Sequence, residues 1–211
     1  NSQRLAKSFE QLDFMVSVDI YLNETSRFAD VVLPPPSQLQ RSHYDLALLT
    51  FAVRNVANYS EPVLSLAPGQ LDEWEILAKL SAIVSGAGIE TDPSVIDDLA
   101  ISSLVQSAIK DSASNVFGRD HQELIAELSL SGRRGPDRIL DFLLRTGPFG
   151  DGFGAVPNGV TLEKLIDSPH GIDFGALEPR LPEVLRTPSG KIEVAPPQLI
   201  ADLSRLLLTL K

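Results

Sequence analysis

The chain has 211 residues, of which 43% are hydrophobic and 22% charged, a balance typical of a globular protein with a sizeable buried core. Its 18 basic and 28 acidic residues give a formal charge of −10, which argues against a nucleic acid duplex as partner because phosphates require a positive field. The chain contains no cysteine, so disulfides, thiolate zinc sites and iron–sulfur ligation from within it are excluded.

No apolar run approaches the roughly 18–20 residues that a membrane span needs. The amino terminus also lacks the basic and then apolar layout of a signal peptide. We therefore expect a cytoplasmic protein without a membrane span. The sequence begins at Asn1, inside a predicted helix, which we interpret as the start of a piece processed or excised from a longer chain.

The first elements alternate between helix and strand. Apolar residues at helical spacing predict a short amphipathic helix over residues 3–12, and a buried strand follows over residues 14–20. A polar turn then leads into a short helix at residues 26–29. The run 31–33 predicts a second strand, which three prolines end at 34–36 because proline cannot donate a ladder hydrogen bond.

The next part is predicted as an apolar segment, a loop and a helix. The length of the apolar run 46–54 favours a strand, although its leucines and alanines would also permit a helical turn. After the loop at 62–69, Asp72 caps a predicted helix over residues 73–84. We expect its core face to carry Trp74, Leu77, Leu80 and Ile83 or Val84, and Gly86 and Gly88 to end it.

Beyond residue 90 helices dominate the prediction. They are expected from Pro93 to about Ile109 and at residues 121–130, 136–144 and 162–166. Loops are expected at 146–159, which is rich in glycine and proline, and at 168–175. The tail at 187–194 predicts a turn into a strand, followed by a helix to the end of the chain.

Asp19 is the main candidate for a binding residue. It comes at the carboxyl end of the first predicted strand, which is where ligands bind in open α/β sheets. A carboxylate there can accept hydrogen bonds from a guanine edge or from ribose hydroxyls. Alternatively, Asp19 only caps the turn that continues through Asn23 to Thr25, and spacing alone favours this structural role.

Two further motifs have preferred structural interpretations. Asp30 is expected to cap or tether the turn before the second strand. The stretch Gly150-Asp151-Gly152-Phe153-Gly154 mimics a phosphate-binding loop. A true dinucleotide fingerprint has a strand before it and a helix after it, whereas here a helix precedes the glycines and Pro157 follows. A flexible connecting loop is therefore preferred.

Residues 12–34 resemble, nearly residue for residue, a stretch of the molybdopterin-dependent oxidoreductases of the formate dehydrogenase, nitrate reductase and dimethyl sulfoxide reductase superfamily. The shared pattern is a strand, an Asp, an aromatic residue, a Thr or Asn, a Thr and then Ala29-Asp30-Val31-Val32-Leu33-Pro34. The tail Thr187-Pro188-Ser189-Gly190-Lys191-Ile192-Glu193 is similar to the segment that introduces the carboxy-terminal dinucleotide-binding barrel of that superfamily. This chain departs from the pattern at His43-Tyr44-Asp45, where many relatives have a Glu-Gly-Thr-like turn.

The resemblance implies a role in binding the cofactor. In these relatives the Asp and the polar residues just after it contact the guanosine end of a pterin dinucleotide, which by position implies Asp19, Asn23 and Thr25 as cofactor-binding residues. The implied cofactor of the parent protein is molybdopterin guanine dinucleotide with molybdenum or tungsten. An iron–sulfur cluster in a preceding domain occurs in many branches. No catalytic residue and no metal ligand is predicted in this chain.

Together these observations predict an α/β fold with a partial Rossmann-like sheet followed by a mainly helical connecting region. We expect residues 1–90 to be the latter part of a Rossmann-like pterin-dinucleotide-binding domain, 91–186 a helical and loop connection, and 187–211 the lead-in to the barrel. Such a fragment would form one wall of the cofactor site and be inactive alone. Its partner would be the rest of the parent polypeptide, with self-association through exposed apolar surface.

Two alternatives differ in class. One is a stand-alone helical interaction or assembly module that has kept a degenerate Rossmann-like core. The other is a nicotinamide-binding Rossmann domain, which is disfavoured because no glycine fingerprint follows the first predicted strand.

Overall fold

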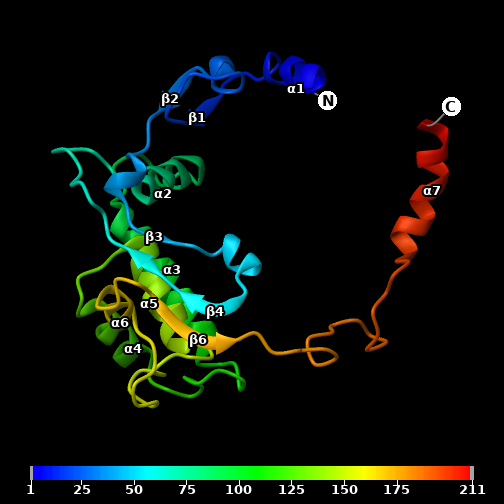
Figure 1. Cartoon of the computed structure of the whole chain (residues 1–211). Helices are drawn as coiled ribbons and strands as arrows, with labels where there is room; N and C mark the ends of the chain where they lie inside the picture. Colours follow the sequence, from blue (N-terminus) through cyan, green and yellow to red (C-terminus); the bar gives the residue numbers. More distant parts are fainter. Residues whose placement is uncertain (1, 210–211) are drawn as a thin grey trace. The chain divides into compact units, whose positions relative to one another are not determined.

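The computed structural model describes residues 2–209 and shows a mixed α/β protein in which helices predominate and the strands are short (Figure 1). The chain divides into two compact units. The first comprises the described residues up to Ala52 together with Val56–Asp173, and the second comprises Val53–Asn55 with the described residues from Phe174 onward. Within residues 2–209, no helix has both the length and the apolar character needed to cross a membrane.

The predicted order of helix, strand, turn and strand at the start of the first unit is confirmed, but the expectation that the first strand is buried is wrong, because Val16 is exposed and the other strand residues are only half-buried. Helix α1 is Ser2–Phe9, and β1 (Val16–Val18) pairs in parallel with β2 (Val31–Leu33), so that Val16 lies opposite Val31. The first strand is shorter than predicted because its partner has only three residues before the prolines begin. A pair this small does not define a Rossmann-like sheet, and that finer part of the fold remains a prediction.

The turn between these strands contains the expected short helix, the 3₁₀ helix η1 (Ser26–Phe28). It is joined to α1 by an aromatic contact, because the ring centroids of Phe9 and Phe28 lie 5.8 Å apart. The carboxylate of Asp30 accepts a hydrogen bond from the backbone N–H of Met15 at 2.8 Å. This bond ties the entrance of β1 to the entrance of β2, so the tethering role preferred for Asp30 is confirmed.

The prediction of a strand over residues 46–54 is wrong. Residues Leu48–Phe51 form the 3₁₀ helix η3, and the Asp45 carboxylate accepts a hydrogen bond from the Leu48 N–H at 2.9 Å. Leu46, Leu48, Phe51 and Val53 are exposed and Leu49 is only half-buried, so no core face holds this segment extended. The local hydrogen bond to Asp45 therefore decides its conformation. The helical turn that the sequence also permitted is the one observed.

The remaining strands form two more pairs. After the 3₁₀ helix η2 (Gln38–Gln40), β3 (His43–Tyr44) pairs antiparallel with β5 (Tyr59–Ser60), and β4 (Arg54–Ala57) pairs with β6 (Ile172–Ala176). The prediction that 168–175 is entirely loop is therefore wrong over its second half. In composition residues 168–175 resemble a turn, with two glycines, one proline and the polar residues Ser168, His170 and Asp173, whereas the strand depends on a partner more than a hundred residues away in the sequence.

Five helices of the first unit match the predicted ones closely (Figure 1). They are α2 (Glu73–Val84), α3 (Pro93–Ala108), α4 (His121–Ser129), α5 (Gly135–Thr146) and α6 (Leu162–Ile166). Side-chain caps fix the beginnings of all of them except α5. For example, Asp72 and Glu75 form a reciprocal capping box, and the Asp92 carboxylate accepts from the Ser94 N–H.

The core of the first unit is helical. α3 packs against α2, α4 and α5, and the largest cluster of buried side chains comes from these helices and the loops beside them. Its fully buried members are Ile101, Val105, Val116, Leu124, Leu128, Phe142 and Phe153. The strand pairs contribute nothing to this cluster. The largest buried cluster is therefore formed by helices and loops, and the buried strand residues Ala57 and Tyr59 lie outside it.

Helix α2 presents a different face to the core than predicted. Its buried residues are Ala78 and Ala82, whereas Leu77 and Ile83 are exposed. Small residues allow α2 to approach its neighbours closely. The indole of Trp74 lies against Gly135, where an added Cβ would stand 2.6 Å from the ring. The glycine at the start of α5 thus makes room for the tryptophan of α2.

In the second unit the predicted final helix is confirmed as α7 (Pro197–Thr209) within the described residues. The predicted turn is also present, since the Gly190 N–H donates to the Thr187 carbonyl at 3.0 Å. The strand expected after it is absent, and residues 191–194 form no regular secondary structure. Ile192 and Val194 are exposed, so nothing holds this segment extended.

Candidate functional site

The strand–turn–strand segment places Asp19 directly after β1. Its backbone N–H donates to the Leu33 carbonyl at 3.2 Å, which prolongs the pairing with β2 by one residue. The carboxylate bends back over the turn: Oδ2 accepts from the Asn23 side-chain amide at 2.7 Å, and Oδ1 accepts from the Tyr21 N–H at 3.3 Å. The structural role that spacing favoured for Asp19 is therefore present.

Asn23 organises the rest of this turn. Its Oδ1 accepts from the backbone N–H groups of Thr25 at 2.9 Å and of Ser26 at 3.0 Å. Ser26 is fully buried, and its hydroxyl donates to the Tyr21 carbonyl while accepting from the Asn23 N–H, both at 2.8 Å. Asn23 therefore caps the turn before η1, whereas the Thr25 side chain makes no capping bond.

The three predicted site residues are therefore brought into one turn, with unequal roles. Asp19 and Asn23 contact each other, whereas Thr25 enters the network through its backbone and leaves its side chain exposed. The hydrogen bond from the Tyr21 N–H, followed by that from Asn23, lowers the pKa of Asp19 below its ordinary value. Asp19 is thus an anion at neutral pH, and each of its oxygens keeps a lone pair for a further donor.

Large apolar side chains in and next to this strand–turn–strand segment are exposed. They are Ile20, Tyr21 and Leu22 in the turn and Phe14 before β1. Four such residues beside a polar and ordered turn form the kind of surface that marks a binding or docking site in a soluble protein.

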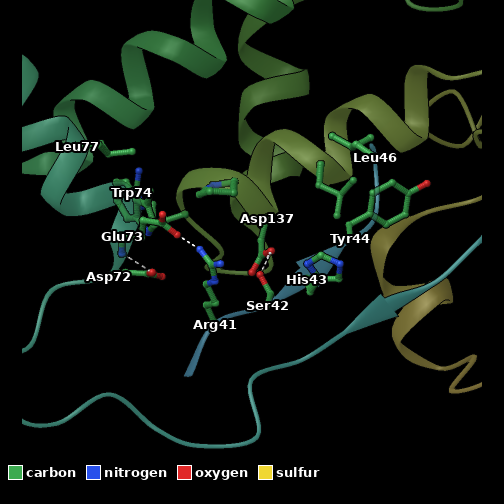
Figure 2. A pocket seen from close by; sticks show the side chains of 13 residues that line it. Arg41, Ser42, His43, Tyr44, Leu46, Asp72, Glu73, Trp74, Leu77 and Asp137 are labelled. Atoms are coloured by element: carbon green, nitrogen blue, oxygen red, sulfur yellow. Dashed lines mark hydrogen bonds and ion pairs between the residues drawn. The ribbon is translucent and has the colours of Figure 1, made fainter. Parts of the chain in front are cut away.

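Sequence reasoning missed a pocket of about 440 Å³ in the first unit, which Figure 2 shows. We call it the α2–α5 pocket because the amino-terminal ends of these two helices form much of its wall. It is lined by Arg41, Ser42, His43, Tyr44, Leu46, Asp72, Glu73, Trp74, Leu77, Arg134, Pro136, Asp137 and Leu140. The start of α2 was predicted from its Asp72 cap and that of α5 from a Gly-Pro pair, but nothing in the sequence indicated that the two helix ends converge with residues 41–46.

Tyr59 is buried beside Ser42 and Asp137 of this pocket. Burial raises its pKa to about 12, and the Asp137 charge acts in the same direction. Because this folded value lies above the unfolded value of about 10, the contribution of neutral Tyr59 to stability is complete below pH ~10 and is lost as the pH rises toward ~12.

We expect a pH titration of phenolate absorbance to show a last phase near pH 12 that Tyr59→Phe removes. Completion of all tyrosine ionisation near the ordinary value of about 10 would contradict the burial of this hydroxyl.

Within residues 2–209, no group of three or more His, Asp or Glu side chains is arranged to hold a metal ion. Comparisons with protein-family models, with curated proteins and with solved structures gave no match to this chain. The turn around Asp19 and the α2–α5 pocket are therefore the two candidate functional sites of the described residues.

Proposed function

We propose that residues 13–34 bind the guanosine end of a molybdopterin guanine dinucleotide and so form one wall of the cofactor site in a molybdenum or tungsten oxidoreductase resembling formate dehydrogenases and nitrate reductases. One observation carries the proposal: an ionised and oriented carboxylate, Asp19, stands at the carboxyl end of a parallel strand, on an ordered polar turn.

The chemistry of Asp19 fits a guanine base. Guanine presents a ring N–H and an amino group side by side, and the two oxygens of a carboxylate can accept from both. Asn23 would fix the plane of the carboxylate through its 2.7 Å hydrogen bond. The exposed Thr25 hydroxyl would be available to the ribose. When bound, the cofactor supplies the metal centre for oxidation and reduction, and this chain supplies binding and orientation only.

The exposed apolar residues around the turn support a second part of the proposal. Phe14, Ile20 and Leu22 would be covered by the rest of the parent polypeptide, which would also provide the catalytic groups. In this proposal the isolated chain has no turnover, because the residues described here orient a cofactor and none of them reacts.

Titration calorimetry with guanosine diphosphate tests the proposal. We expect weak binding, with a dissociation constant near ~1 mM, and a tenfold or greater loss in Asp19→Ala, because hydrogen bonds to a charged group contribute about 1.5–3 kcal/mol. Glu24→Ala is the matched control, since it removes an exposed carboxylate from the same turn.

Three results would contradict the proposal. These are the absence of heat at millimolar guanosine diphosphate, equal losses in the two variants, and equal affinity for adenosine diphosphate, whose base lacks the paired donors. Circular dichroism of both variants checks that the turn substitution leaves the helices folded.

A second candidate is a stand-alone helical interaction or assembly module. The location of the core favours it, since the largest buried cluster comes from helices and loops and includes no strand residue. Sequencing the parent gene on both sides separates the two candidates. Cysteine-rich sequence upstream and a barrel downstream would support the cofactor site, and neither is expected for an assembly module.

A further inference from the structure

The α2–α5 pocket contains more carboxylates than available cations (Figure 2). Of its two arginines, Arg41 forms an ion pair with Glu73. Arg134 is engaged outside the pocket, where its guanidinium contacts Asp98 at 2.5 Å and Asp97 at 3.5 Å. Both positive charges are therefore already matched.

Two carboxylates remain in the pocket without an ion pair among the described residues, Asp72 and Asp137. Asp137 accepts a hydrogen bond from the Ser42 hydroxyl at 2.6 Å, and Asp72 accepts one from the Glu73 N–H at 2.6 Å. Both donors are neutral. Burial raises the pKa of Asp72, the charges of Glu75 and Asp137 act in the same direction, and the charge of Arg41 opposes them.

Each of these carboxylates lies in the first turn of a helix, Asp72 at the cap of α2 and Asp137 two residues after Gly135 in α5. The positive end of a helix dipole is a favourable place for a carboxylate, but its partial charge offsets only part of the carboxylate's full negative charge. The pocket therefore retains an uncompensated negative potential that a ligand can satisfy.

The other walls of the pocket are apolar or aromatic. They are formed by Tyr44, Leu46, Trp74, Leu77, Pro136 and Leu140. Leu46 and Leu77 are more than half exposed, so a ligand that covered them would remove apolar surface from water. Trp74 is held in place by its contact with Gly135, and aromatic rings attract cations.

We propose that the α2–α5 pocket binds a small organic cation, namely a primary amine carried on an apolar body, with the ammonium group near Asp137 and Asp72 and the apolar body against Leu77 and Trp74. Its volume of about 440 Å³ lies within the range of small-molecule sites. This site shares no residue with the turn around Asp19, so it stands or fails independently of the proposed cofactor role.

The chain itself provides the readout, because Trp74 is its single tryptophan and lines the pocket. The probes are cyclohexylmethylamine, its neutral analogue cyclohexylmethanol and the anion cyclohexanecarboxylate, which share one apolar body and differ in charge. In the full chain at low ionic strength, the amine should change Trp74 fluorescence in a saturable way, with a dissociation constant of about 1 mM or below. The alcohol should bind at least tenfold more weakly and the carboxylate not at all.

Two conservative variants locate the charge that matters. Asp137→Asn keeps an acceptor for the Ser42 hydroxyl, and Asp72→Asn keeps a good helix cap, so both should fold. Each should weaken amine binding about fivefold or more. Asp167→Asn makes the same change of charge at an exposed position outside the pocket and should leave binding unchanged.

The proposal is overturned by equal responses to the amine and the alcohol. Tighter binding of the carboxylate, or an Asp167→Asn effect as large as that of Asp137→Asn, would also overturn it. So would the absence of both a fluorescence change and calorimetric heat up to about 10 mM amine, since a site built for this cation should be occupied there.

Discussion

Asp97→Ala should lower the free energy of unfolding by about 3–5 kcal/mol, because it removes a fully buried carboxylate from between two helices. The side chain of Asp97 is 0% exposed and accepts hydrogen bonds from the Gly135 N–H at 3.0 Å and from Arg138 at 3.1 Å. Arg138 is itself 3% exposed, and its Nε has no hydrogen-bond partner in the described residues. Without Asp97, a buried guanidinium would lose one of its two counter-ions.

Asp98→Ala is the matched control for this prediction. Asp98 contacts the same two arginines at 2.5 and 2.6 Å, but its side chain is 54% exposed, so water can replace it. We expect a loss of about 1 kcal/mol or less. Urea denaturation followed by far-ultraviolet circular dichroism measures both variants. Equal losses would mean that burial of the carboxylate does not determine the strength of this link.

The link from α3 to α5 also matters for the proposed cation site. Asp97 accepts from the first N–H of α5, and the next residues of that helix, Pro136 and Asp137, line the α2–α5 pocket. Arg134 is turned toward the Asp97 and Asp98 carboxylates by the same network. The buried ion pair therefore holds a carboxylate in the pocket and diverts an arginine that would otherwise neutralise it.

Short-range features could be predicted from the sequence because their physics is local. The caps Asp72 and Asp92 mark the beginnings of α2 and α3, since a cap needs only the next two or three N–H groups. Asp19 and Asn23, which contact each other, are likewise only four residues apart in the sequence, so the sequence could indicate a polar turn there.

Features that depend on distant partners could not be predicted in this way. The strand β6 needs β4, and the α2–α5 pocket needs three segments separated by tens of residues. For the same reason, the ion-pair partner of a charged side chain cannot be read from the sequence. Arg134 and Asp137 are three residues apart in the sequence, yet Arg134 is paired with a carboxylate of α3 whereas Asp137 accepts a hydrogen bond from the neutral Ser42 hydroxyl.

In the glycine-rich loop at 150–154, backbone N–H groups donate to an aspartate of the loop itself. The Asp151 carboxylate accepts hydrogen bonds from the N–H groups of Phe153 at 3.0 Å and Gly154 at 3.1 Å. A bound phosphate would need backbone N–H groups such as these, and here Asp151 already occupies them. It also forms a two-pronged pair with Arg145, both contacts at 2.9 Å. The preferred connecting role is confirmed, but the loop is held by these bonds and is not simply a flexible linker.

Gly150→Ala should destabilise the chain by about 3 kcal/mol, because there is no room for a side chain at this position. An added Cβ would lie 2.2 Å from the carbonyl oxygen of Arg145 and 2.3 Å from that of Leu144. Both are backbone atoms at the end of α5, so neither can turn aside as a flexible side chain would. The helix end or the loop must shift, and either movement strains the Arg145–Asp151 pair.

Gly154→Ala separates this packing cost from the cost of backbone conformation. Gly154 has a φ of +82°, where an L-residue is strained, but an added Cβ would meet nothing within 4 Å. We expect a loss of about 1–2 kcal/mol, the ordinary cost of the left-handed region. Urea denaturation of Gly150→Ala and Gly154→Ala shows which variant loses more free energy of unfolding. If Gly154→Ala were the more damaging, conformational strain and not the close approach of the loop to α5 would govern this part of the fold.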